Sequence, residues 1–111
     1  MRIDFVNTMT RIRQMDVRFE LNGDTFVWDA TKSERNWGKH GIQFAEAAAV
    51  FADPLFVLVD AARNEEARQA AIGFDATGRL LYVVHLEFEM DCIRLISARR
   101  ATYAEEHRYA D

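Results

Sequence analysis

Three arginines at the ends of apolar segments, Arg68, Arg99 and Arg100, could bind phosphate or carboxylate groups. A guanidinium stays charged at any relevant pH, and its planar fork of N–H donors matches the oxygens of both anions. The alternative is that each is an exposed arginine that only aids solubility. Since Arg94 precedes them and residues 93–104 contain no acidic side chain, this part of the chain is expected to be locally basic.

A second group of cationic side chains recurs at helical spacing earlier in the chain. One face of a helix there would carry a basic stripe, made by Lys32, Arg35, Asn36, Lys39 and His40. An imidazole titrates near neutral pH, so His40 could transfer protons, but it also falls where this helix should end and could instead cap exposed carbonyls. Lys39 would serve as a cationic clamp, or as a base only if its pKa were strongly depressed.

The other polar aromatic residues also have two interpretations. His85 lies inside an apolar segment and is expected to be a half-buried structural histidine, whereas His107 should face solvent. Tyr103 and Tyr109 could stack on the bases of a single nucleic-acid strand. Alternatively, these tyrosines anchor a final helix to a sheet.

No motif for a metal, a disulfide or a nucleotide is apparent. Cys92 is the single cysteine, so no intramolecular disulfide and no CxxC site can form. The carboxylates Asp53, Asp60 and Glu105 lack metal-ligand spacing, and the chain has no glycine-rich phosphate loop and no Ser/His/Asp pattern. We therefore expect neither a metal nor a cofactor.

Composition indicates one globular domain. The chain has 111 residues, 50% hydrophobic and 29% charged, which suffices for one core. Its net charge of −4 counts against general nucleic-acid binding. Most of the basic residues are arginine rather than lysine. This bias would suit contacts with anions, or it would reflect a GC-rich genome. The longest apolar run, residues 47–52, is too short to span a bilayer. With no secretory signal apparent, we expect a cytoplasmic protein without a membrane partner.

The periodicity predicts an α+β fold. Alternating residues around Asn22-Gly23 predict a β-hairpin. Asp29 should cap a surface helix that ends at Gly41. A short amphipathic helix follows and stops at Asp53-Pro54.

The second half should form most of a small sheet. Four strands are expected at residues 55–59, 68–74, 80–88 and 92–98. Their short connections favour mostly antiparallel pairing. Thr102 and Glu105 match a capping box that begins a C-terminal helix.

The turn at residues 76–78 sets the strand register. If it pairs Phe74 with Leu80, Arg68 shares a face with Tyr82 while His85 points to the other face. Arg99 joins that face under only one parity of the next hairpin. It would then lie roughly 13 Å along the sheet from Arg68, so the two arginines would hold different phosphates.

Several motifs follow one another in a fixed order: Phe26-Val27-Trp28-Asp29, Lys39-His40-Gly41 and Ile96-Ser97-Ala98-Arg99. Together they resemble the BrnT family of type II toxin–antitoxin ribonucleases over about residues 26–110. The resemblance implies a compact RelE-like fold, metal-independent RNA cleavage, and neutralisation by a ribbon-helix-helix antitoxin of the BrnA type. The complex would bind operator DNA only through the antitoxin. Residues 1–24, a tail plus the first hairpin strand, would be an extension to a toxin domain at residues 25–111.

Cleavage of RNA without a metal needs a base for the 2′-hydroxyl, cations for the developing phosphorane charge and an acid for the leaving oxygen. With the resemblance, the catalytic candidates are Lys39, His40, Arg68 and Arg99, with His40 in the proton-transfer role. The candidate RNA or phosphate ligands are Lys32, Arg100, Tyr103 and Tyr109.

A non-catalytic binding module is the competing hypothesis. The same arginines would then hold an acidic segment of an antitoxin or another partner without turning over RNA. The net acidity of the chain favours this hypothesis, as does Gln69, because the family commonly has an aromatic residue there. The Lys39-His40-Gly41 and Ile96-Ser97-Ala98-Arg99 motifs favour the ribonuclease.

Overall fold

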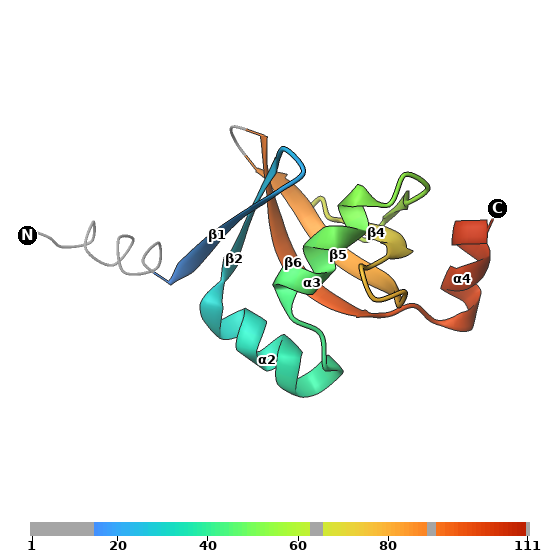
Figure 1. Ribbon diagram of the computed structural model, residues 1–111, viewed down its shortest axis with the longest axis horizontal. Coiled ribbons are helices and arrows are strands. Elements are labelled where there is room, and N and C mark those ends of the chain that lie inside the picture. The colour runs from blue at the N-terminus through green and yellow to red at the C-terminus, as the bar shows by residue number, and fades with distance from the viewer. Residues whose placement is uncertain (1–14, 63–65, 89–90, 111) are drawn as a thin grey trace, which may run out of the picture.

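The computed structural model describes residues 15–62, 66–88 and 91–110 (Figure 1). These residues form an α+β fold, as predicted. The elements in chain order are β1 (Asp16–Leu21), β2 (Asp24–Asp29), α2 (Ala30–His40), α3 (Phe44–Ala48), the 3-10 helix η1 (Ala49–Ala52), β3 (Val57–Asp60), β4 (Gln69–Phe74), β5 (Leu80–Phe88), β6 (Cys92–Arg100) and α4 (Tyr103–Ala110). The predicted tail before Met15 lies outside the described residues.

The strands form one six-stranded sheet in the order β1-β2-β6-β5-β4-β3. Four neighbouring pairs are antiparallel, whereas β2 and β6 run parallel. The mostly antiparallel sheet is confirmed, but it is larger than expected and mixed. The prediction rested on short connections, which favour antiparallel pairing. Strands β2 and β6 are not joined by a short connection, because α2, α3 and three strands lie between them in the sequence. This segment is long enough for the crossover that parallel pairing needs.

Both predicted turns set the expected register. Asn22 and Gly23 have φ values of 54° and 86°, as a tight hairpin turn requires, and Phe19 pairs with Phe26 across it. At the β4–β5 turn, Phe74 pairs with Leu80. The hairpin predictions are therefore confirmed.

Helix α2 begins and ends where its capping residues predict. The Asp29 carboxylate accepts hydrogen bonds from the first turn, and Gly41 ends the helix in the left-handed conformation. One assignment was wrong: Asn36 does not belong to an exposed basic stripe but is buried. Its side-chain amide donates to the carbonyls of Ile42 and Ala98 and accepts from the Ala98 amide, at 2.9 to 3.0 Å. Helix α2 has few apolar side chains. These hydrogen bonds therefore hold it against β6 where apolar packing would otherwise do so.

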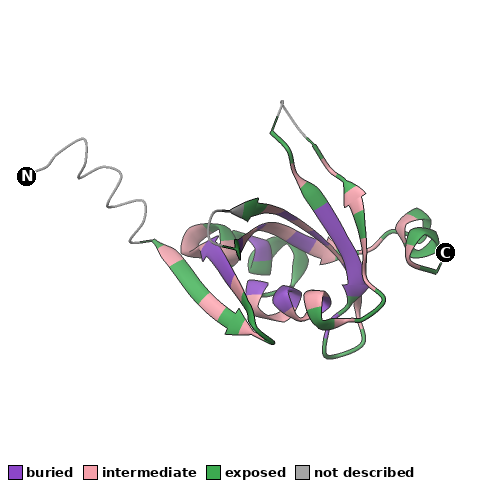
Figure 2. Cartoon of the chain, turned by 90° about the horizontal axis from the view of Figure 1, so that it is seen from above, coloured by how far each residue is buried: buried purple, intermediate pink, exposed green. Residues whose placement is uncertain are grey.

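Helices α2 and α3 cover one face of the sheet (Figures 1 and 2). The core between them has aromatic and small aliphatic side chains at its centre, among them Phe26, Phe44, Val83 and Ala98. His85 is buried on the same side and lies edge-on to Phe51, with ring centroids 4.8 Å apart. The prediction that His85 points away from the face of Arg68 is thus confirmed.

Helix α4 lies at the periphery of the fold, and none of its residues is buried (Figure 2). The predicted capping box is present, since the Glu105 amide donates to Thr102 Oγ1 and the Thr102 amide donates to Glu105 Oε1. The Tyr109 hydroxyl donates to Asp53 at 2.8 Å, and its ring meets Phe74 edge-on. Tyr109 therefore has the anchoring role that was its alternative interpretation.

Two glycines are expected to respond oppositely to alanine substitution. A Cβ at Gly73 would lie 2.9 Å from Phe56 Cβ and 3.0 Å from Val50 Cγ1, whereas a Cβ at Gly38 meets nothing within 4 Å. Gly73→Ala should lower the free energy of unfolding by about 1–3 kcal/mol through overpacking. Gly38→Ala, inside α2, should raise it by about 0.5–1 kcal/mol. Urea unfolding measures both, and equal effects of the same sign would contradict the packing described around Gly73.

Candidate functional site

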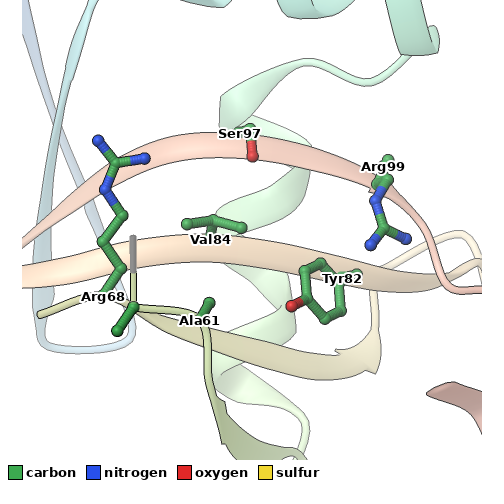
Figure 3. Close-up of a pocket in the computed structure, with 7 residues that line it drawn as sticks. Ala61, Arg68, Tyr82, Val84, Ser97 and Arg99 are labelled. Carbon is green, nitrogen blue, oxygen red and sulfur yellow. The ribbon is translucent and has the colours of Figure 1, made fainter. Parts of the chain in front are cut away.

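An open pocket of about 440 Å³ lies on the sheet face opposite α3 (Figure 3). It is lined by Ala61, Ala62, Arg68, Tyr82, Val84, Ser97 and Arg99. Figure 3 shows Arg68 at one end and Arg99 at the other, with the strand residues between them. The pocket therefore presents two cations separated by a polar and partly apolar floor.

Strand alternation places these residues together. Tyr82 pairs with Arg99 and Val84 pairs with Ser97 across β5 and β6, so all four point to the same face. Arg68 precedes β4 and reaches this face from the neighbouring strand, as the predicted register required. Of the two parities that the sequence left open for the β5–β6 hairpin, the structure has the one that brings Arg99 to Arg68's face.

Arg99 is held from two sides. Its Nη1 and Nη2 atoms donate to Oε1 and Oε2 of Glu105 at 2.8 and 2.9 Å. Its guanidinium carbon lies 4.1 Å from the centroid of the Tyr82 ring, a cation–π contact. The Glu105 hydrogen bonds raise the pKa of Arg99 above its usual range and, reciprocally, lower the pKa of Glu105. Both groups are therefore charged at any physiological pH.

Arg68 also has a carboxylate partner. Its Nε and Nη2 atoms lie 2.8 and 2.7 Å from Glu66 Oε1. The Arg68 side chain is 24% exposed, and it lines a second hollow beside β3 as well as the main pocket. Both pocket arginines thus form an ion pair with a carboxylate of the same chain, and their binding of a substrate phosphate stays a prediction.

Two hydroxyl groups in the pocket were not identified from the sequence. Ser97 lies on the middle of the floor, and the Tyr82 hydroxyl points along the sheet toward the space between the arginines (Figure 3). From the sequence, Tyr82 was predicted only to share a sheet face with Arg68. The signal that could have found both residues was their alternation with Arg99 on paired strands.

The basic residues of α2 lie elsewhere. Lys32, Lys39 and His40 are exposed on this helix, and none of them is among the residues that line the pocket. Asn36 binds the backbone of β6, so α2 packs against that strand on the face of the sheet that bears the core. The pocket lies on the opposite face. The structure therefore does not gather the predicted catalytic residues: it brings Arg68 and Arg99 together, and Lys39 and His40 form a separate surface.

Two further residues predicted to bind RNA, Arg100 and Tyr103, are not among the residues that line the pocket. Arg100 follows Arg99 on β6 and pairs with Leu81, a core residue, so it projects to the helix-covered face. Tyr103 is 76% exposed and meets His107 edge-on, with centroids 4.7 Å apart, so it does not anchor α4. Arg94 donates to Asp16 of β1 at 2.7 Å. The locally basic C-terminal segment is therefore partly neutralised by carboxylates from other elements.

His85 should make stability depend on pH. Burial holds the pKa of His85 below its usual value, so the neutral ring favours the folded state. Its stabilisation is complete above the unfolded pKa, about 6.5, and declines as the pH falls from there through the folded pKa. Urea unfolding at pH 7.5 and 5.5 should show a larger loss for the wild type than for His85→Gln. Equal losses would show that His85 does not contribute.

Among the described residues, no group of three or more His, Cys, Asp or Glu side chains could hold a metal ion. Within the same residues, no helix has both the length and the apolar character needed to cross a membrane. Cys92 is buried with a free thiol.

Comparison with known proteins identifies the family. A family model described as the ribonuclease toxin BrnT of type II toxin–antitoxin systems matches residues 28–105. A crystal structure of the Brucella abortus ribonuclease toxin BrnT is similar in fold, with a TM-score of 0.55 and 23% identity, covering 68% of this chain and 92% of that one. No curated protein matches the sequence. Because the family model spans more than half of the chain, the protein belongs to the BrnT family of ribonuclease toxins of type II toxin–antitoxin systems.

Proposed function

We propose that the chain is an active cytoplasmic endoribonuclease of RelE-like type that cleaves single-stranded RNA without a metal in the pocket between Arg68 and Arg99. The observation that carries the proposal is the placement of both arginines on one open face with the Tyr82 and Ser97 hydroxyls between them. Membership of a ribonuclease toxin family supports the same reaction.

In this mechanism the RNA 2′-hydroxyl gives its proton to solvent water in the open pocket and attacks the adjacent phosphorus; the bond from phosphorus to the 5′-oxygen breaks, and that oxygen leaves with a proton supplied by the protein. Arg99 stabilises the negative charge that develops on the scissile phosphate, where a fixed guanidinium has its largest effect, and Arg68 binds a second phosphate of the same strand. Because the two arginines lie at opposite ends of the pocket, we assign them to two different phosphates of one strand (Figure 3). Of the pocket hydroxyls, the Tyr82 phenol points between the arginines (Figure 3), and we assign it the protonation of the leaving oxygen. His40, the proton-transfer group favoured by the sequence, would have to act from outside the pocket.

The remaining cationic and aromatic residues would bind RNA beyond the scissile phosphate. Lys32 and Lys39 on α2 present exposed charges beside β6, and Tyr103 offers an exposed ring for stacking on a base. We assign Arg100 and Tyr109 lesser roles, since Arg100 projects to the other face and the Tyr109 hydroxyl is bound to Asp53.

We further propose that a ribbon-helix-helix antitoxin of the BrnA type neutralises the toxin, and that operator DNA is bound only through it. Family membership supports an antitoxin partner. We also propose a toxin domain at residues 25–111, a range that includes the residues 28–105 matched by the family model, and an extension at residues 1–24 that includes β1.

A non-catalytic partner-binding module is the second candidate. It is favoured by one specific observation: each pocket arginine holds a carboxylate, Glu66 on Arg68 and Glu105 on Arg99. An acidic segment of a partner could replace these carboxylates without any reaction.

Incubation of the purified protein with end-labelled RNA in EDTA separates the two candidates. The ribonuclease should release fragments with 2′,3′-cyclic phosphate and 5′-hydroxyl ends, and RNA with 2′-deoxy sugars should stay intact. Products with 3′-hydroxyl and 5′-phosphate ends would contradict the 2′-hydroxyl mechanism. Intact RNA would favour the binding module.

A further inference from the structure

We propose that Glu105 is a positioning residue for Arg99: it binds one edge of the guanidinium and leaves the other edge open toward the pocket for a substrate phosphate. The inference rests on the proposed function, because it concerns how Arg99 meets the RNA. It gives α4, which buries none of its residues, a role in the site.

The geometry distinguishes two edges of the Arg99 guanidinium. The end-on edge is occupied, since Nη1 and Nη2 donate to the two Glu105 oxygens at 2.8 and 2.9 Å. The second Nη1 hydrogen is directed to the Arg100 carbonyl, 3.1 Å away. Within residues 15–62, 66–88 and 91–110, no hydrogen-bond partner is found for Nε. The side-on edge, made by Nε–H and the remaining Nη2 hydrogen, is therefore available for a bidentate phosphate contact.

Tyr82 fixes the plane in which that edge lies. The guanidinium carbon stacks 4.1 Å from the Tyr82 ring centroid, while the Arg99 side chain keeps 35% of its surface exposed. A flexible arginine loses conformational entropy when it binds a phosphate. The Tyr82 ring on the guanidinium face and Glu105 on the end-on edge impose that loss during folding, so Arg99 meets the substrate already oriented.

Glu105 is itself fixed by the start of α4. Its Oε1 atom accepts from the Thr102 amide at 2.9 Å in the capping box, in addition to Arg99. Tyr109, at the far end of α4, is bound to Asp53. One carboxylate thus joins the helix cap to the pocket arginine, which a capping role alone does not require.

A double-mutant cycle with a matched control tests the positioning role. Glu105→Gln keeps the size and the acceptor for Thr102 but places an amide donor against an Arg99 donor. The single-turnover rate of RNA cleavage should fall by about tenfold to a hundredfold, on the order expected for a misplaced group. In an Arg99→Lys background, which lacks the fork, Glu105→Gln should have little further effect. Thr102→Ala removes a cap hydrogen bond without touching Arg99 and should leave the rate within about twofold.

Two kinetic outcomes would overturn the inference. If Glu105→Gln lowered the cleavage rate in the Arg99→Lys background as much as it does in the wild type, Glu105 would act through the stability of α4. A faster rate or tighter RNA binding by Glu105→Gln would show that Glu105 masks Arg99 rather than positions it.

A readout independent of RNA cleavage separates this inference from the proposed function. The Arg99 Nε–H resonance should be sharp in the wild type and in Thr102→Ala, broaden in Glu105→Gln, and shift when inorganic phosphate is added to the wild type. An unchanged resonance in Glu105→Gln would reject the positioning role whatever the activity. An ordered Arg99 in a protein that leaves RNA intact would reject the proposed function and retain the positioning of Arg99.

Discussion

Arg99→Ala is expected to lower kcat/KM for RNA cleavage by about 10²- to 10³-fold, the range seen when one preorganised donor to a developing oxyanion is removed. Arg68→Ala should have a smaller effect, expressed mainly in KM, because Arg68 at the other end of the pocket binds a phosphate on which no charge develops. Cleavage of a labelled oligonucleotide under steady-state conditions measures both variants.

The control for this prediction is Arg108→Ala. Arg108 is exposed in the last turn of α4, so its removal changes the net charge by the same amount without touching the pocket. Its kcat/KM should stay within about threefold of the wild type, since only nonspecific electrostatic attraction changes. If Arg99→Ala and Arg108→Ala lowered the rate equally, the effect would come from net charge and the assignment of the pocket would fail.

Asn36→Ala is expected to be the most destabilising single substitution on α2, lowering the free energy of unfolding by about 3 kcal/mol. The Asn36 amide satisfies three backbone groups, the Ile42 carbonyl and both the amide and the carbonyl of Ala98. All of them lose their partner when the side chain is truncated, and the site is too buried for water to replace it without rearrangement.

Urea unfolding of Asn36→Ala beside Arg35→Ala tests this prediction. Arg35 is the exposed neighbour on the same helix, and its loss should change the free energy of unfolding by no more than about 0.5 kcal/mol. A change below 1 kcal/mol for Asn36→Ala would mean that the three hydrogen bonds contribute far less than their burial implies.

Elements that depend on local signals could be predicted from the sequence. Asn22-Gly23 fixed the first hairpin, Asp29 and Gly41 bounded α2, and Thr102 with Glu105 began α4. Each of these signals acts within a few residues, through a special φ angle or a side-chain cap. The same local rule gave the β4–β5 register and, through strand alternation, the shared face of Arg68 and Tyr82.

Features that depend on distant contacts could not be predicted. The parallel pairing of β2 with β6 and the burial of Asn36 against Ala98 join segments far apart in the sequence. In the sequence, Asn36 falls at helical spacing with Lys32 and Lys39, so it cannot be distinguished from a residue of an exposed polar face. Its burial follows only from its backbone partners, which lie outside the helix. Lys39 and His40 are separated from the pocket because α2 covers the opposite face of the sheet, and no local signal specifies which face a helix covers.

Glu105 illustrates how a correct local prediction can be incomplete. Its position three residues after Thr102 predicted the capping box, which uses Oε1. The pairing of both carboxylate oxygens with Arg99 depends on how α4 lies relative to the end of β6, and no spacing within the chain specifies that.

The most direct test of the central claim is an NMR titration with a 2′-O-methyl RNA oligonucleotide, which can bind but cannot be cleaved through the 2′-oxygen. Binding in the pocket should shift the Nε–H resonances of Arg68 and Arg99 and the backbone amides of Tyr82 and Ser97. Shifts confined to Lys32, Lys39 and the rest of α2, with the pocket resonances unchanged, would contradict the claim and place the RNA on the helix.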